Sequence, residues 1–194
     1  MSHLDMQASR SSSSSNSSQD WPFSVVECPP SVSYSLIADC GYNLDKVKTV
    51  MGPVLKVGER CQVTSNYIQA VATGRTNFLV TNLVESPERA GSAWATAIAS
   101  NWLIGRHSSC ALPILHLSIS RHHAVIGHQD GRFYLVDVGS SNGTWLNGKQ
   151  INNGDRYDLQ DGDVIRFGTL MVEFFISRQT IVPANVTSTG EDTL

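Results

Sequence analysis

A series of short β-forming runs, each followed by a turn signal, constrains this chain more than any other feature of its sequence. The series extends from Thr76 to residue 177. Its runs occupy residues 78–84, 96–104, 119–127, 133–138, 144–146, 164–167 and 170–176. Short strands at this spacing are typical of two packed antiparallel sheets. The sequence therefore predicts an all-β fold, an antiparallel β-sandwich, over residues 76–177.

Turn-forming residues separate these runs. Gln-Asp-Gly at 129–131 and Asp-Gly-Asp at 161–163 favour tight turns, and Asn147-Gly148 is a strong signal for a two-residue hairpin turn. The Ser-Ser-Asn-Gly stretch at 140–143 is equally dense in turn residues. We expect a loop there, directly after the run at 133–138.

The first 75 residues do not show this pattern of short β-forming runs. Residues 1–20 are dominated by serine, and such a segment buries too little apolar surface to offset its ordering entropy, so we predict disorder. Residues 21–75 form a predicted N-terminal extension. Its first part, 21–43, contains Pro29-Pro30 and is expected to be an irregular tether. At the other end of the chain, residues 178–194 lack periodicity and are expected to form a flexible tail.

A small helical pair is predicted over residues 44–74. One apolar stripe recurs at helical spacing and consists of Val47, Val50, Met51, Val54 and Leu55. Gly52-Pro53 interrupts this stripe, so the helix kinks there or a new one begins near Pro53. A second helix is predicted over 59–72, with Gly74 as its stop. The pair is expected to pack on the neighbouring domain or to drive self-association.

The totals exclude several functions. The net charge is −3 and only 16% of residues are charged, so a general basic field for nucleic acid is absent. The four cysteines show no CxxC spacing and no signal peptide is evident, which favours reduced thiols in a cytoplasmic protein. No apolar run approaches the roughly 20 residues that span a bilayer. We therefore expect no membrane insertion.

Four motifs occur in register over about a hundred residues. They are Ile-Gly-Arg at 104–106, Ser-Arg-His-His-Ala at 120–124, Asn-Gly-Thr at 142–144 with Asn147-Gly148, and the closing stretch 159–168. Their order and separation resemble the forkhead-associated (FHA) family, and we expect a bacterial-type member. The resemblance implies a sandwich of about eleven strands that binds phosphothreonine peptides through loops at one end.

By this resemblance, the phosphopeptide-binding residues are Arg106, Ser120, Arg121, Ser141 and Asn142. A phosphothreonine carries nearly two negative charges and strong acceptor oxygens, so guanidinium and hydroxyl donors suit it. Asn142 resembles the family residue that bonds the bound peptide's backbone. Each residue also has a structural interpretation: the two arginines could lie on the surface, and the other three could form turns.

A second set is expected to support the binding loops: Gly105, His123, Gly143, Thr144 and Asn147. The glycines let the chain turn where larger residues would clash. His123 precedes an apolar run and is expected to hydrogen-bond nearby backbone. The resemblance implies the same scaffold role.

No cofactor, metal ion or catalytic group is expected. Adjacent His122 and His123 point to opposite faces of a strand, so they do not share an ion easily. No acid/base pair stands out, and the phosphate-loop pattern GxxxxGK is absent. The chain is predicted to be no enzyme.

The leading hypothesis is a non-catalytic adaptor that docks on a threonine-phosphorylated protein in Ser/Thr kinase signalling. The alternative is a phosphate-independent assembly protein that oligomerises through residues 44–74. The loop at 107–119 lacks acidic residues, and Leu112, Ile114 and Leu115 favour either an apolar ligand residue or core packing. Thr189, followed by Gly-Glu-Asp, is a candidate self-ligand.

Overall fold

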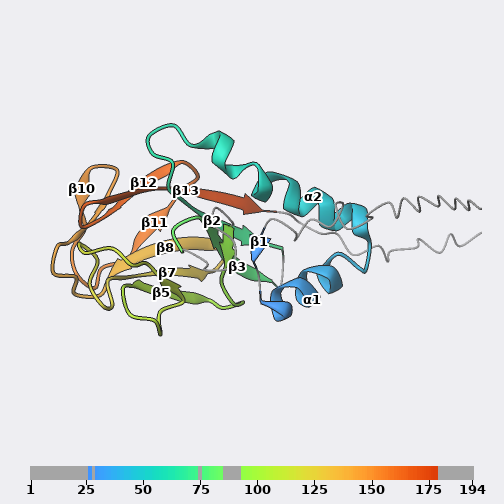
Figure 1. The fold of residues 1–194 in the computed structure, drawn as a ribbon, viewed down its shortest axis with the longest axis horizontal. Helices are drawn as coiled ribbons and strands as arrows, with labels where there is room; N and C mark the ends of the chain where they lie inside the picture. Colours follow the sequence, from blue (N-terminus) through green and yellow to red (C-terminus); the bar gives the residue numbers. More distant parts are fainter. Residues whose placement is uncertain (1–25, 28, 74–75, 85–92, 179–194) are drawn as a thin grey trace, which may run out of the picture.

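The computed structural model describes residues 26–27, 29–73, 76–84 and 93–178. It is a two-sheet β-sandwich with two helices on one outer face (Figure 1). The predicted disorder of 1–20, the predicted stop at Gly74 and Thr189 all lie outside the described residues. So does the predicted tail, except for Arg178.

The larger sheet contains eight strands in the order β1-β4-β3-β2-β13-β12-β9-β10. Their bounds are Val26–Glu27 (β1), Tyr67–Ala72 (β2), Asn77–Thr81 (β3), Ala93–Ala95 (β4), Thr144–Leu146 (β9), Lys149–Gln150 (β10), Asp163–Phe167 (β12) and Leu170–Arg178 (β13). Neighbours are antiparallel except at the β1–β4 and β13–β2 pairs.

The smaller sheet contains five strands in the order β11-β8-β7-β5-β6. Their bounds are Asn101–Gly105 (β5), Leu112–Pro113 (β6), Ala124–Gln129 (β7), Arg132–Asp137 (β8) and Tyr157–Leu159 (β11). Only the β5–β6 pair is parallel. The predicted all-β sandwich is confirmed, with thirteen strands in the described part of the chain.

The main core lies between the two sheets. Alternate residues of facing strands fill it, including Trp102, Phe133, Phe167 and Phe174, each at most 1% exposed. Gly127 on β7 has a separate role, because a Cβ there would collide with the Tyr134 ring. That ring lies across the glycine, and its hydroxyl donates to Asn101 Oδ1 at 2.7 Å. The missing side chain thus lets three strands pack closely.

A helical layer covers the outer face of the larger sheet. Helices α1 (Pro30–Asp39) and α2 (Leu44–Leu55) bury one face each against Val71, Phe78 and Val80 of β2 and β3. Asn43 caps α2 by accepting hydrogen bonds from the N–H groups of Asp45 and Lys46. Four of the five residues of the predicted stripe, Val47, Val50, Met51 and Val54, are therefore buried within the protein's own fold, whereas Leu55 is exposed.

Two local predictions in this region are wrong. The predicted helix over 59–72 is a short 3-10 helix, η1 (Val57–Arg60), followed by strand β2. Strand β2 lies in the middle of the sheet under the helices, with both faces buried, and an apolar run of that kind has no period that separates strand from helix. The sheet thus includes residues that precede the predicted domain range 76–177.

The second error concerns residues 21–43, predicted as an irregular tether. Within them, Pro30–Asp39 forms α1, with Pro30 in the first turn. A proline there costs no hydrogen bond and presets the backbone angle, so the Pro29-Pro30 pair begins a helix.

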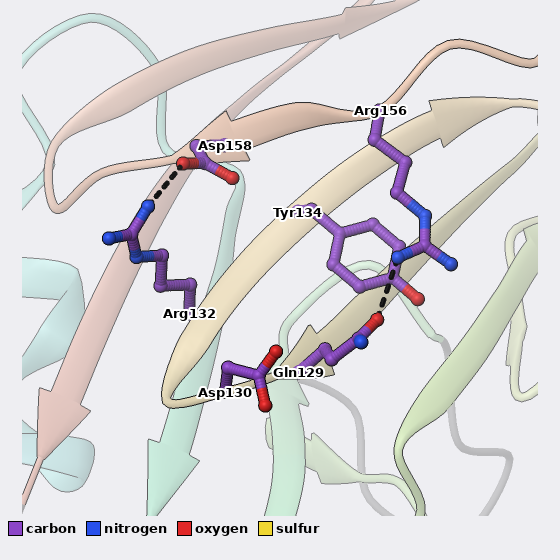
Figure 2. Close-up of a pocket in the computed structure, with 6 residues that line it drawn as sticks. All are labelled: Gln129, Asp130, Arg132, Tyr134, Arg156 and Asp158. Carbon is purple, nitrogen blue, oxygen red and sulfur yellow. Dashed lines mark hydrogen bonds and ion pairs between the residues drawn. The ribbon is translucent and has the colours of Figure 1, made fainter.

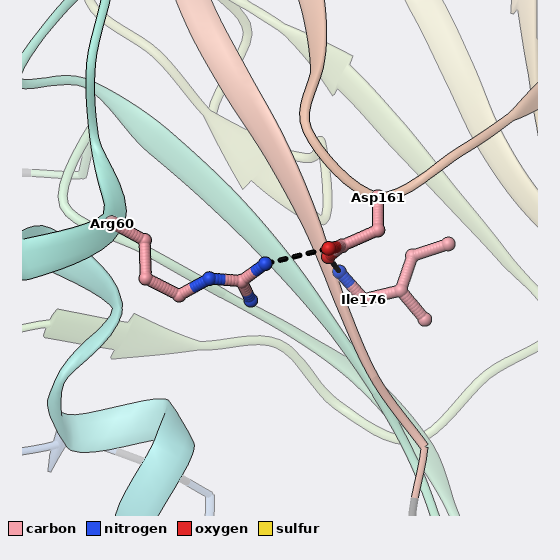
Figure 3. Close-up of polar contacts among 3 residues, drawn as sticks. All are labelled: Arg60, Asp161 and Ile176. Carbon is pink, nitrogen blue, oxygen red and sulfur yellow. Dashed lines mark hydrogen bonds and ion pairs between the residues drawn. The ribbon is translucent and has the colours of Figure 1, made fainter.

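Two polar contacts fasten the segment after α2 to the sandwich. Arg60 Nη2 lies 2.6 Å from Asp161 Oδ2, and the other oxygen of Asp161 accepts from Ile176 N at 2.8 Å (Figure 3). The Arg60 guanidinium also lies over the Phe175 ring, 4.4 Å from its centre. Nearby, one oxygen of the buried Glu173 accepts three backbone N–H groups, from residues 62, 63 and 64, at 2.8–3.0 Å.

Candidate functional site

Three loops meet at one end of the smaller sheet. The first follows β5, the second precedes β7, and the third joins β8 to β9. The strand register places their ends side by side, since Ala124 pairs with both Ile104 and Asp137. All five predicted binding residues lie on these loops.

Arg106 begins the first loop and is exposed. Its N–H donates to the Ser120 carbonyl at 2.9 Å, and the next N–H, of His107, donates to the Arg121 carbonyl at 3.1 Å. A side chain at Gly105 would collide with that same Arg121 carbonyl. Glycine at this position thus permits the close contact between the first and second loops.

Ser120, Ser141 and Asn142 connect the second loop with the third. The Ser141 N–H donates to Ser120 Oγ at 2.9 Å, and the two serine hydroxyls lie 3.4 Å apart. Asn142 Nδ2 donates to the Ser118 carbonyl at 2.9 Å. Ser141 and Asn142 are exposed and Ser120 is half-buried, so their polar groups line the surface of one tip.

The exposed Arg106 and Arg121 bring positive charge to this tip. Within the described part of the chain, neither guanidinium has an ion-pair partner. Both charges are therefore available to an anionic ligand.

His123 is fully buried and bridges the second and third loops. Its Nδ1 accepts the Ser120 N–H at 3.1 Å, which leaves Nε2 as the donor to the Gly143 carbonyl, also at 3.1 Å. Burial lowers the pKa of His123, and this effect outweighs the Gly143 carbonyl and Asp137, which raise it. The ring is therefore held neutral, with hydrogen bonds that fix its tautomer.

Asp137, at the end of β8, organises the third loop, and the sequence interpretation missed it. Its carboxylate accepts from the N–H groups of Gly139 and Ser140 and from the hydroxyls of Ser140 and Thr144, at 2.6–2.8 Å. Burial alone would raise the pKa of Asp137, but these donors bring it below the usual value. An aspartate two residues before the Gly-Ser-Ser stretch at 139–141 was the available signal.

The other predicted support residues also have specific contacts. Gly143 has a positive φ of 78°, and a Cβ there would press on Gln150 and Trp145. Asn147 has a φ of 51° and bonds the next hairpin: its amide donates to Asp163 and accepts from Val164 N. Thr144 is buried, and its hydroxyl donates to Asp137.

The apolar loop before β7 divides into two parts. Leu112 and Ile114 are buried in the main core, which settles them as packing residues. Leu115 and Leu117 are 83% and 92% exposed. Among the leucines and isoleucines of this loop, Leu115 and Leu117 are therefore the ones exposed to a ligand.

A separate hollow of about 400 Å³ lies at the β7–β8 turn (Figure 2). This turn is the opposite end of the hairpin from the three loops, since Gln129 pairs with Arg132 there. Arg132 lies 3.4 Å from Asp158, and Arg156 bonds Gln129 and covers the Tyr134 ring. Two arginines and two aspartates line this hollow, so it has no net positive charge, and the three-loop tip is the better anion site.

No group of His, Cys, Asp or Glu within the described ranges is arranged to hold a metal ion. None of the helices described is both long and apolar enough to cross a membrane.

A rigid β-sandwich with cationic and polar side chains on the loops of one tip has the architecture of a loop-based binding module. Residues 102–168 match the family model of the FHA domain. The chain therefore contains an FHA domain, as its motifs predict.

Known relatives come from animals, plants and bacteria. Mouse Smad nuclear-interacting protein 1 is 36% identical over 106 residues, which cover 47% of this chain and 26% of that protein. The oxoglutarate dehydrogenase inhibitor of Corynebacterium diphtheriae is 37% identical over 70 residues, which cover 36% of this chain and 47% of the inhibitor. The match thus spans less than half of either relative. The mixture of sources does not support the expected bacterial type.

Among solved structures, the N-terminal FHA domain of S. cerevisiae Rad53p, in complex with a phosphothreonine peptide, is 34% identical. The match covers 34% of this chain and 53% of the solved chain, with a TM-score of 0.31. A likeness at this TM-score supports no functional conclusion by itself.

Proposed function

We propose that this protein is a phosphothreonine-peptide-binding module that acts as a non-catalytic adaptor in Ser/Thr kinase signalling. The observation that carries the proposal is the convergence of Arg106, Ser120, Ser141 and Asn142 on one tip, where Arg106 has no ion-pair partner among the described residues. The FHA match over residues 102–168 supports the same function.

Each residue has a chemical task in this proposal. The Arg106 guanidinium binds the phosphate dianion, Arg121 adds a second positive charge, and the hydroxyls of Ser120 and Ser141 donate to phosphate oxygens. Asn142 bonds the peptide backbone and holds it extended. Because His123 and Asp137 fix the loops beforehand, little conformational entropy is lost on binding.

The test is calorimetric titration with a degenerate phosphothreonine peptide library and with its unphosphorylated twin. We expect binding only to the phosphorylated library, and its loss in Arg106→Ala. Arg132→Ala, at the other end of the β7–β8 hairpin, is the matched control and should bind like wild type. Equal binding of both libraries would refute the proposal.

The alternative, a phosphate-independent assembly protein that self-associates through residues 44–74, stays a prediction. The apolar stripe that suggested self-association is not available for it, because Val47, Val50, Met51 and Val54 pack on the protein's own sheet. Deleting residues 1–75 would also remove β2, a central strand of the larger sheet, so this truncation cannot test the helices alone. Polar substitution of Tyr34 and Leu55, which are 74% and 41% exposed, leaves the sheet intact. Light scattering of that variant and of wild type then tests whether the helices drive self-association.

A further inference from the structure

A hollow of about 320 Å³ opens beside Arg106. It is lined by Leu83, Val84, Arg106, Ser108, Pro113 and Leu115. Four of these six side chains are apolar. Leu83 and Val84 follow β3, whereas Pro113 and Leu115 lie in and just after β6. One wall of the hollow thus carries a positive charge, and most of the rest is aliphatic.

Leu115 gives this hollow its open rim. It is 83% exposed, although its neighbour Ile114 is 3% exposed and belongs to the main core. The backbone at this point is held in place, because the Ile114 N–H donates to the Gly105 carbonyl and the His116 N–H donates to the Ile114 carbonyl, both at 2.9 Å. Leu115 is therefore presented to solvent by a fixed backbone next to the Gly105-Arg106 pair.

We propose that this hollow receives an aliphatic side chain of the same peptide whose phosphothreonine is bound at Arg106. The inference rests on the proposed function and specifies its ligand class: a phosphothreonine peptide with a Leu, Ile, Val or Met close to the phosphate. Arg106 would contact both the phosphothreonine and the aliphatic residue, with its guanidinium on the phosphate and its methylene groups against the apolar wall of the hollow.

Size and chemistry both favour this occupant. The volume is at the lower end of the range of about 300–1,000 Å³ typical of small-molecule pockets, which suits one large side chain rather than a cofactor. An acidic side chain would meet only one cation, already engaged by the phosphate. A lysine or arginine would meet the Arg106 charge, and none of the described lining residues carries a carboxylate. An aliphatic group instead covers Leu83, Pro113 and Leu115 and removes their apolar surface from water.

The position of that residue is limited by chain geometry. An extended peptide advances about 3.3 Å per residue, so a side chain that reaches a hollow adjoining Arg106 belongs to one of the few residues on either side of the phosphothreonine. A positional scan is therefore sufficient to find it.

The test uses phosphothreonine peptides in which each flanking position in turn carries leucine or asparagine. Wild type should prefer leucine by about tenfold at one position, the discrimination that a small apolar pocket provides. In Leu115→Asn this preference should fall to within about twofold while phosphate dependence persists. The matched control is Leu117→Asn, a leucine that is 92% exposed but does not line the hollow, and it should keep the wild-type preference.

The outcomes separate the two claims. Phosphate-dependent binding with no aliphatic preference at any position, or with a preference that Leu115→Asn leaves intact, would overturn the hollow's role and leave the proposed function standing. Binding without regard to phosphate would overturn the proposed function, and this inference with it.

Discussion

His123 and Asp137 shape the candidate site without facing its surface. His123 joins the Ser120 N–H to the Gly143 carbonyl, and Asp137 gathers four donors from Gly139, Ser140 and Thr144. Both groups are buried and fully engaged. The loops that carry the proposed binding residues are thus held by interior hydrogen bonds, as a preorganised site requires.

His123 predicts a pH dependence of stability. Its pKa is lower in the folded protein than in the unfolded chain, so protons bind preferentially to the unfolded state. The contribution of His123 is fully present above the unfolded-state pKa of about 6.5 and is lost as the pH falls from there toward the folded pKa. His128, whose pKa burial and Arg178 also lower, acts in the same direction.

Urea unfolding at about pH 7.5 and about pH 5.5 measures this loss, and NMR titration of the two imidazoles assigns it. In the folded protein, the His123 ring should titrate below the unfolded-state pKa of about 6.5. A His123 ring that titrates at or above that value would contradict the account.

The sequence motifs contained exposed residues of the candidate site, such as Arg106, and also buried ones, such as His123 and Thr144. Arg106, Ser120 and Asn142 lie in motifs whose spacing is visible, and the structure places them at one tip. Asp137 was missed because an aspartate at a strand end shows its partners only when the loop is folded around it. The sequence also could not show which leucines of the apolar loop are buried, because Leu112 and Leu115 are the same residue type and differ only in exposure.

Among the elements, β8, β9, β12 and β13 were close to their predicted bounds. They border solvent on one side or end in strong turns, so alternation and turn residues define them. Strand β2 was mistaken for a helix because α2 covers its outer face. Period-based reasoning fails at such an element, since burial on both faces removes the polar positions that mark the period.

Strand β2 also contains a polar residue that is expected to destabilise the fold. Gln69 is fully buried, and in the described part of the chain neither amide atom has a hydrogen-bond partner. It lies on the helix-facing side of the sheet, on the same face as Val71. An unsatisfied buried amide costs about 1–3 kcal/mol.

Gln69→Leu should therefore raise the free energy of unfolding by about 1–2 kcal/mol, because a side chain of similar size replaces the unpaired amide. Denaturant unfolding measures the change. Gln150→Leu, on the exposed edge strand β10, is the control and should change stability by less than about 0.5 kcal/mol. A lower stability of Gln69→Leu would show that the amide has a partner, such as a buried water.

At the scale of the whole molecule, the helical layer and the sandwich are connected through residues 57–66. Glu173 anchors this connection by accepting three backbone N–H groups. Burial alone would raise the pKa of Glu173, but these donors lower it. Its stabilising contribution is therefore present at neutral pH and lost as the pH falls through the folded pKa.

Glu173→Ala should lower the free energy of unfolding by about 1–3 kcal/mol, because three backbone N–H groups lose a charged acceptor. It should also speed proteolytic cleavage between α2 and β2. Arg60→Ala is the comparison: both side chains of the Arg60–Asp161 pair are more than one-third exposed, so solvent screens it, and we expect a loss within about 1 kcal/mol. Equal effects of the two substitutions would contradict the anchoring role of Glu173.

Phosphate recognition at the tip of the sandwich is proposed to depend on Arg106. A thermodynamic cycle that combines Arg106→Ala with removal of the peptide's phosphate tests it most directly, by titration of each of the four combinations. The account predicts a coupling of about 2 kcal/mol or more, because the guanidinium and phosphate lose each other's charge-assisted hydrogen bonds. A coupling near zero, with Arg106→Ala equally harmless or equally harmful to both peptides, would contradict it.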